Sequence, residues 1–293
     1  MANTYASEST RTTTSTSTSI ADRRRAFHRL HQSGCFAIPN PWDVGSVRWL
    51  QGLGFKALAT TSSGFAWSRG HPDNGITREM ALAHLREMVQ ACELPVNADF
   101  ENGFGVDAAA VQESVQLAVQ TGVAGLSIED STGDAASPLF TLDEAVERIR
   151  AARRAIDANG GDTLLTGRAE CFLHGRPDLD ETIARLKAYA DAGADCLYAP
   201  GIQTPEQIGA VVAAVAPKPV NLLYTKPGAL TMADIAALGV RRVSVGGALA
   251  RAAWGGFMRA AHLLAERGSF EGFAGAASGN ELNGFFLGDV KRS

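Results

Sequence analysis

The sequence predicts an α/β protein folded as a (β/α)8 TIM-type barrel, and three observations support this prediction. The chain has 293 residues, of which 45% are hydrophobic, and this is enough for one large core. Beyond residue 20, short apolar runs alternate with helical patterns of roughly 10 to 18 residues. Eight such units can be counted. Parallel strands joined by helical crossovers close into a barrel at that number.

Each expected strand is a short apolar run that leads into polar or turn-forming residues. The eight runs are 36–39, 57–61, 96–101, 125–130, 164–170, 196–200, 220–225 and 243–247. Helices fit between them, and some have readable starts, such as the capping box Thr141-Leu-Asp-Glu144 and Thr204 before Pro205. A doubly wound open sheet has the same alternation, but the turn after its first strand is usually glycine-rich. Here residues 39–43 read Pro-Asn-Pro-Trp-Asp, which favours the barrel.

The chain divides into three segments. Residues 1–19 form a Ser/Thr-rich tail that is too poor in apolar groups to fold, so we expect it to be disordered, with a transit peptide as the alternative. Residues 20–267 form the barrel and end in a long helix, 249–267. Residues 268–293 are a glycine-rich extension with four phenylalanines, which we expect to pack on a neighbouring subunit: Phe270, Phe273, Phe285 and Phe286.

Charge and cysteine content limit the class of partner. The 27 basic and 31 acidic residues are interleaved and give a net charge of −4, which argues against a nucleic-acid partner. The four cysteines form no CxxC pair, as is typical of a reducing compartment, so we expect a cytoplasmic protein. No stretch approaches the roughly 18 uninterrupted apolar residues that a membrane-spanning helix needs, so no membrane partner is expected.

Acidic residues gather where the third and fourth strands end. In a barrel of this kind, the loops at the carboxyl ends of the strands form the working face. Asp99 and Glu101 are two apart on one strand, so both side chains point to the same side, and Glu129 ends the next strand. Carboxylates this close repel one another unless a cation lies between them. Their oxygen ligands suit Mg²⁺, with Mn²⁺ as the alternative ion.

Other residues at the same rim are candidates to line a substrate pocket. Trp42 and Asp43 follow the first strand, and Tyr224 lies near the end of the seventh, where packing is an equal interpretation. His71 and His174 lie in rim loops, and a histidine there can act as an acid or base near neutral pH. A surface or hydrogen-bonding role is the alternative for both.

Residues 36–254 resemble the isocitrate lyase/phosphoenolpyruvate mutase superfamily, especially its short bacterial members of the phosphonomutase and methylisocitrate lyase type. Several motifs in the right order carry the resemblance: Ser63-Gly64, Gly70-His-Pro-Asp73, Asp99-x-Glu101-x-Gly103-Phe104-Gly105, Ile128-Glu129-Asp130 and Gly167-Arg168-Ala-Glu170. The resemblance implies a (β/α)8 barrel that assembles as a homodimer or homotetramer.

The resemblance also implies roles for single residues. Asp99 would ligate Mg²⁺ directly or through water, and Glu101, Glu129 and Asp73 would complete a ring of carboxylates around it. Backbone amides at Ser63 and Gly64 would hold the substrate carboxylate, and Arg168 would pair with a substrate anion. Arg168, Glu129 and Asp73 would then be the catalytic residues of a domain that spans 20–267.

One departure from the family pattern narrows the reaction. Lyases that cleave isocitrate or methylisocitrate resemble one another in a Lys-x-Cys-Gly-His loop, whereas residues 131–138 here read Ser-Thr-Gly-Asp-Ala-Ala-Ser-Pro. The expected activity is therefore a Mg²⁺-dependent lyase or decarboxylase that cleaves a C–C bond in a small 2-oxo or 2-hydroxy polycarboxylate through a metal-stabilised, pyruvate-like enolate. The alternatives are a P–C bond enzyme, such as a phosphonopyruvate hydrolase or phosphoenolpyruvate mutase, and a barrel that binds a dicarboxylate without turning it over.

Overall fold

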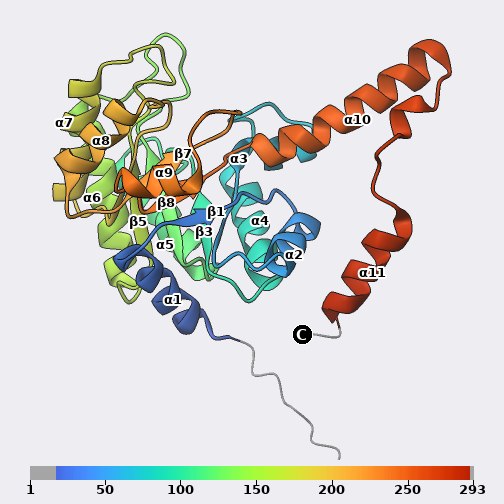
Figure 1. Ribbon diagram of the computed structural model, residues 1–293. Coiled ribbons are helices and arrows are strands. Elements are labelled where there is room, and N and C mark those ends of the chain that lie inside the picture. Colours follow the sequence, from blue (N-terminus) through green and yellow to red (C-terminus); the bar gives the residue numbers. More distant parts are fainter. Residues whose placement is uncertain (1–17, 291–293) are drawn as a thin grey trace, which may run out of the picture.

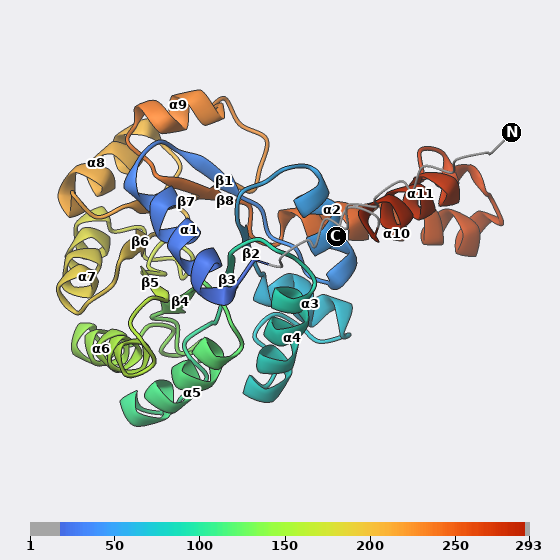
Figure 2. The ribbon, with the colours of Figure 1, turned by 90° about the horizontal axis from the view of Figure 1, so that it is seen from below.

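A computed structural model describes residues 18–290 and confirms the predicted barrel (Figures 1 and 2). Eight parallel strands follow one another in the order β1-β8-β7-β6-β5-β4-β3-β2. Ala59 N donates to Pro39 O at 3.1 Å and links the exits of β2 and β1, so the barrel is nearly closed. The strands are β1 Phe36–Ile38, β2 Leu58–Ala59, β3 Val96–Asp99, β4 Gly125–Glu129, β5 Leu164–Arg168, β6 Cys196–Tyr198, β7 Val220–Leu223 and β8 Arg242–Ser244.

Helices between the strands form the outer ring, which Figure 2 shows from one end of the barrel. The capping box expected at Thr141 is present and fixes the start of α6. Thr204, which was expected to start a helix before Pro205, does so at α8 and also forms a capping box with Gln207. The helices of the ring are α2 Val44–Gly52, α3 Ser62–Ser68, α4 Arg78–Gln90, α5 Ala108–Gln120, α6 Leu142–Ala158, α7 Leu179–Asp191, α8 Pro205–Val215 and α9 Met232–Ala237.

A further helix, α1 (Ile20–Gln32), closes the amino-terminal mouth of the barrel. Phe27 is fully buried in a small cluster with residues of several strands, among them Ile38 and Leu164. His31 Nδ1 lies 2.8 Å from Phe27 O, and its Nε2 lies 3.3 Å from Nη1 of Arg242 inside the barrel. Burial lowers the pKa of His31 to about 3, so the ring is neutral and can accept from the arginine. Ligands must therefore enter from the opposite, carboxyl-terminal mouth.

The last part of the chain leaves the barrel. Helix α10 (Ala248–Arg267) runs outward, and α11 (Gly279–Val290), which the sequence did not predict, turns back toward α2 (Figure 1). Phe285 of α11 packs on Trp49 with ring centroids 4.4 Å apart, while Phe270 is 70% exposed. The tail predicted to be disordered lies, except for residues 18 and 19, outside the described residues. Across the described part of the chain, no helix is long and apolar enough to span a membrane.

Candidate active site

A cavity of about 340 Å³ opens at the carboxyl ends of the strands, where the sequence predicts the site. Its wall brings together residues of all eight strands and of the loops that follow them. Five of the predicted site residues line it: Ser63, Asp73, Asp99, Glu129 and Arg168. The fold therefore concentrates acids, hydroxyls and one guanidinium around one concave space, which is the usual arrangement of a small-molecule site.

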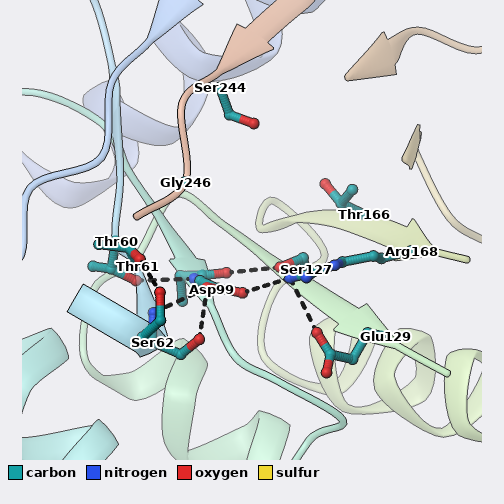
Figure 3. Close-up of polar contacts among 12 residues, drawn as sticks. Thr60, Thr61, Ser62, Asp99, Ser127, Glu129, Thr166, Arg168, Ser244 and Gly246 are labelled. Atoms are coloured by element: carbon teal, nitrogen blue, oxygen red, sulfur yellow. Dashed lines mark hydrogen bonds and ion pairs between the residues drawn. The ribbon is translucent and has the colours of Figure 1, made fainter. Parts of the chain in front are cut away.

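Asp99, the last residue of β3, is held by the segment that follows β2 (Figure 3). Ser62 donates to Asp99 Oδ2 from both its backbone N and its Oγ, each at 2.9 Å. The backbone N of Asp99 donates to Thr60 Oγ1, also at 2.9 Å. The two bonds from Ser62 orient the carboxylate, and the third ties the backbone of Asp99 to the neighbouring segment. The sequence analysis singled out Ser63, whereas Ser62 is the residue that holds Asp99.

Arg168 ends β5 and reaches acids from three strands or strand ends. Its Nη1 lies 3.1 Å from Asp99 Oδ1 and 3.0 Å from Glu129 Oε2 (Figure 3). Its Nε donates to Glu170 Oε1, and its Cζ lies 5.1 Å from the centroid of the Tyr198 ring. The prediction assigned Arg168 to a substrate anion, whereas in this structure the guanidinium is bound to the protein's own carboxylates.

Burial shifts the acids of the site toward their neutral forms. Burial raises the pKa of Glu129 well above its usual range, against the opposing effect of Arg168. Burial likewise raises the pKa of Glu170. Asp73 is exposed as a whole residue at the cavity mouth, yet partial desolvation and the charge of Asp99 raise its pKa too. One arginine is thus surrounded by more carboxylates than it can neutralise.

Glu101 lies just beyond β3 in a strained conformation, with φ at 45°, which non-glycine residues rarely adopt. It is 8% exposed, and its Oε1 is buried without a hydrogen-bond partner. Burial, followed by the charges of Asp99 and Asp73, raises its pKa to about 8. Strain and an unpaired buried carboxyl oxygen at one position are typical of a functional site.

These acids fit a divalent cation, although they do not form a complete set of ligands by themselves. Between residues 18 and 290, no three His, Cys, Asp or Glu side chains come together as a metal-binding group. The predicted ring of Asp99, Glu101, Glu129 and Asp73 is therefore looser than expected, because Arg168 lies between Asp99 and Glu129. Mg²⁺ keeps several waters and needs only one or two carboxylates, and Asp99 is the acid of β3 that lines the cavity. Glu101, whose Oε1 is buried and unpaired, is not among the lining residues.

A buried network beneath the rim positions Glu170. Asp130 Oδ2 accepts from Tyr189 Oη at 2.6 Å and from Arg185 Nη1 at 3.0 Å, and its Oδ1 accepts from Glu170 N at 2.8 Å. Asp130 is thus a positioning residue in this structure, since both of its oxygens are bound to protein groups. The motif Glu129-Asp130 combines one cavity acid with one structural acid.

Four predicted substrate-binding residues do not line the cavity. Asp43 caps α2, where its Oδ1 accepts from Ser46 N at 2.7 Å. Trp42 faces a separate hollow beside α10. The Oη of Tyr224 accepts from Leu230 N at 3.3 Å. Gly64 lies in the first turn of α3, and its N donates to Thr61 Oγ1 at 3.3 Å. Ser63 and Gly64, whose backbone amides were expected to hold a substrate carboxylate, thus begin a helix.

The loop that replaces the expected cysteine motif folds largely onto itself. Thr132 Oγ1 donates to Ser137 O at 2.6 Å and accepts from Asp134 N at 2.9 Å. An isolated β-bridge pairs Ser131 with Leu139 and closes the loop at its base. Within the run 131–138, Ser131 is the residue that reaches the cavity. The loop as it stands contributes one hydroxyl and no thiol, imidazole or amine.

Several residues of the cavity wall were not among the predicted site residues. Tyr198, Glu170 and His174 all line it, and all follow from the strand-end rule that located the others. Of these three, His174 was considered as a rim-loop histidine without being chosen. The amide and guanidinium groups deeper in the barrel, Asn97, Asn221 and Arg242, gave no such signal because they lie inside the strands.

Comparison with known proteins places the chain in a family. The phosphoenolpyruvate phosphomutase family model matches residues 27–265. A crystal structure of a proposed lyase/mutase from Burkholderia cenocepacia J2315 is 51% identical, with a TM-score of 0.88, over 92% of this chain and 97% of that one. Oxaloacetate decarboxylase of Bradyrhizobium sp. (strain ORS 278) is 33% identical, over 76% of this chain and 77% of its own length.

A third relative carries ligands that bear on the site. A phosphonopyruvate hydrolase, solved in complex with oxalate and Mg²⁺, is 26% identical with a TM-score of 0.80, over 92% of this chain and 96% of that one. Fold, cavity and matches agree on an enzyme of the lyase type built on a barrel. The chain belongs to the phosphoenolpyruvate mutase/isocitrate lyase superfamily.

Proposed function

We propose that this enzyme is a Mg²⁺-dependent decarboxylase of a small 2-oxo dicarboxylate, with oxaloacetate as the first candidate. The observation that carries the proposal is the composition of the cavity wall. The wall offers Arg168 and several acids, while the loop 131–138 supplies only Ser131. Counted from the carboxylate that leaves, oxaloacetate is a 3-oxo acid, and loss of CO₂ from such an acid needs chiefly a group that accepts electrons. Decarboxylation is therefore the lyase reaction that the missing loop cysteine affects least. The name of the Bradyrhizobium relative supports the same choice.

Asp99 is the proposed residue that holds Mg²⁺, with Glu101, Glu129 and Asp73 accepting from waters on the ion. Asp99 is oriented by Ser62 and Thr60, and a carboxylate held in this way loses little freedom when it binds a cation. A bound Mg²⁺ supplies positive charge that stabilises the developing enolate. Mn²⁺ has similar ligand preferences and is the expected substitute.

The remaining wall residues bind and orient the substrate in this proposal. Arg168 is the fixed fork that can pair with a carboxylate, once Mg²⁺ takes over part of the negative charge of Asp99 and Glu129. The hydroxyl of Ser63 and the backbone of Gly247 lie on the cavity wall and face one another closely, since a Cβ added to Gly247 would lie 3.0 Å from Ser63 Oγ. A side chain at residue 247 would therefore narrow the space for a ligand there.

A purified-enzyme assay tests the proposal. Oxaloacetate, substituted malates and phosphonopyruvate are each incubated with the full chain and Mg²⁺, and CO₂, oxo acid and phosphate are measured. We expect CO₂ and pyruvate from oxaloacetate, and loss of both when a chelator removes the metal. Phosphate from phosphonopyruvate alone would favour P–C chemistry instead. Binding of oxaloacetate without turnover of any compound would favour the non-catalytic barrel.

A further inference from the structure

We propose that His174 is the catalytic acid that protonates the enolate carbon, the role for which the loop 131–138 offers no group. The assignment rests on the proposed function, because it names the residue that completes that reaction. Among residues 18–290, His174 is the one histidine that lines the cavity. It belongs to the loop after β5, on the same side of the barrel as Arg168 and Glu170.

The position of His174 suits a group that exchanges protons with solvent and delivers them inward. Its side chain is 29% exposed, yet it forms part of the cavity wall. Its backbone N donates to Glu170 O at 3.2 Å, which turns the loop back over the end of the strand. An acid in this place can regain its proton from water after each turnover without opening the buried part of the site.

Glu170 is placed to hold the imidazole. His174 Nε2 lies 3.9 Å from Glu170 Oε2, while the other carboxylate oxygen of Glu170 accepts from Arg168. The backbone of Glu170 is anchored in turn, because its N donates to Asp130 at 2.8 Å. A carboxylate anchored through both its side chain and its backbone limits the positions that the neighbouring imidazole can take.

The other proton-bearing groups of the wall suit this role less well. Ser131 is a hydroxyl, and burial raises the pKa of Tyr198 further above its usual range, so both give up a proton reluctantly at neutral pH. Glu170 already accepts a hydrogen bond from Arg168. Asp73 is one of the acids proposed to surround the metal. An imidazole has the ordinary pKa closest to the working pH of a cell, which makes it the most effective acid among them.

The step balances without any further reactant. Cleavage of the C3–C4 bond of oxaloacetate releases CO₂, and the electron pair of that bond forms the C2–C3 double bond of the pyruvate enolate. C3 then takes the proton from the His174 imidazolium, the double-bond electrons form the new C–H bond, and the C2 carbonyl is restored. The neutral imidazole recovers its proton from water. Nothing is oxidised or reduced by an outside reagent.

The test separates CO₂ release from proton transfer. His174→Gln and the matched control His28→Gln, which alters a histidine of α1 at the opposite mouth of the barrel, are compared with the wild-type chain in Mg²⁺. CO₂ release is measured with oxaloacetate. Deuterium entry into the methyl group of pyruvate is measured in D₂O by NMR. For His174→Gln we expect the rate of deuterium entry into the pyruvate methyl group to fall about 100-fold or more, which is the usual contribution of a general acid. The rate of CO₂ release should stay within about tenfold of wild type. The control should match wild type in both.

Chemical rescue gives a second, independent readout. Added imidazole should restore methyl exchange to His174→Ala, because the cavity left by the side chain opens to solvent, and a purely structural histidine would show no such rescue. Wild-type exchange rates in His174→Gln would overturn the assignment while leaving the decarboxylase intact. Equal loss of CO₂ release and exchange, without rescue, would also overturn it. A wild-type chain that releases no CO₂ from oxaloacetate would overturn the proposed function first, and this assignment with it.

Discussion

The Nη1 atom of Arg168 lies 3.1 Å from Asp99 Oδ1, so an ion pair joins the end of β5 to the end of β3 across the strand between them. The same nitrogen also reaches Glu129 of that middle strand at 3.0 Å. One guanidinium therefore holds the acidic strand ends together. Side-chain exposures of 15% for Arg168 and 9% for Glu129 mean that solvent screens this cluster weakly.

Removal of the Arg168 charge should destabilise the fold. Arg168→Gln leaves buried carboxylates without their cation, and breaking a buried pair in this way typically costs about 3–5 kcal/mol in the free energy of unfolding. Urea denaturation at pH 7 in the presence of a chelator measures this loss in the free energy of unfolding. Arg176→Gln is the matched control, because the pair of Arg176 with Glu181 is more exposed and should be worth less than about 1 kcal/mol. Equal losses for the two variants would contradict the proposed importance of the cluster.

Asp99→Asn should abolish tight Mg²⁺ binding while preserving the fold. The amide keeps the size of the side chain and can still accept from Ser62, but it removes the charge that would attract the ion. Calorimetric titration with Mg²⁺ alone should show affinity reduced by about 100-fold or more, since even outer partners of metal ligands change affinity about 10–100-fold. Asp107→Asn, which alters the cap of α5, should bind Mg²⁺ as wild type does. Unchanged affinity in Asp99→Asn would place the metal elsewhere.

The order of the elements and the rim acids could be predicted because each depends on local patterns. The alternation of runs located all eight strands, and the rule that strand ends meet at one mouth brought Asp99, Glu129 and Arg168 together. The Thr141 and Thr204 caps were readable for the same reason, since a cap and its partner are three residues apart.

What the sequence could not predict depends on backbone direction after a strand ends. Trp42 and Asp43 lie four and five residues beyond the end of β1, yet Asp43 is used to start α2, and the chain turns away from the cavity there. Gly64 is drawn into a helix by the cap of Thr61. The binding of Arg168 to Asp99 and Glu129 requires the actual spacing between strands, which no one-dimensional pattern contains.

The exposed aromatic residues of the arm, by which we mean residues 248–290, predict a homo-oligomer. Phe270 and Phe273 are 70% and 51% exposed, a large apolar surface for a free monomer. The double substitution Phe270→Ser/Phe273→Ser should shift a dimer or tetramer toward smaller species in light scattering at micromolar concentration. Val106→Ser is the control, because Val106 is 93% exposed but lies outside the arm. An unchanged mass for the double variant would exclude these rings from the interface.

Glu101 should make the metal-free protein less stable as the pH rises. Its pKa in the folded chain is raised to about 8 from an ordinary value of 4.5, so the folded state keeps a proton that the unfolded chain has lost between these two values. The wild-type free energy of unfolding should therefore fall through that window relative to Glu101→Gln, with a slope of up to about 1.4 kcal/mol per pH unit. Below pH 4.5 Glu101 is protonated in both states and the difference in stability should level off; above pH 8 it is ionised in both states and the difference should level off again.

Denaturation curves at pH 5, 6, 7 and 8 in the presence of a chelator measure the slope. Saturating Mg²⁺ should flatten it, because a nearby cation favours the charged carboxylate, and parallel curves for the two proteins without metal would show that Glu101 ionises normally.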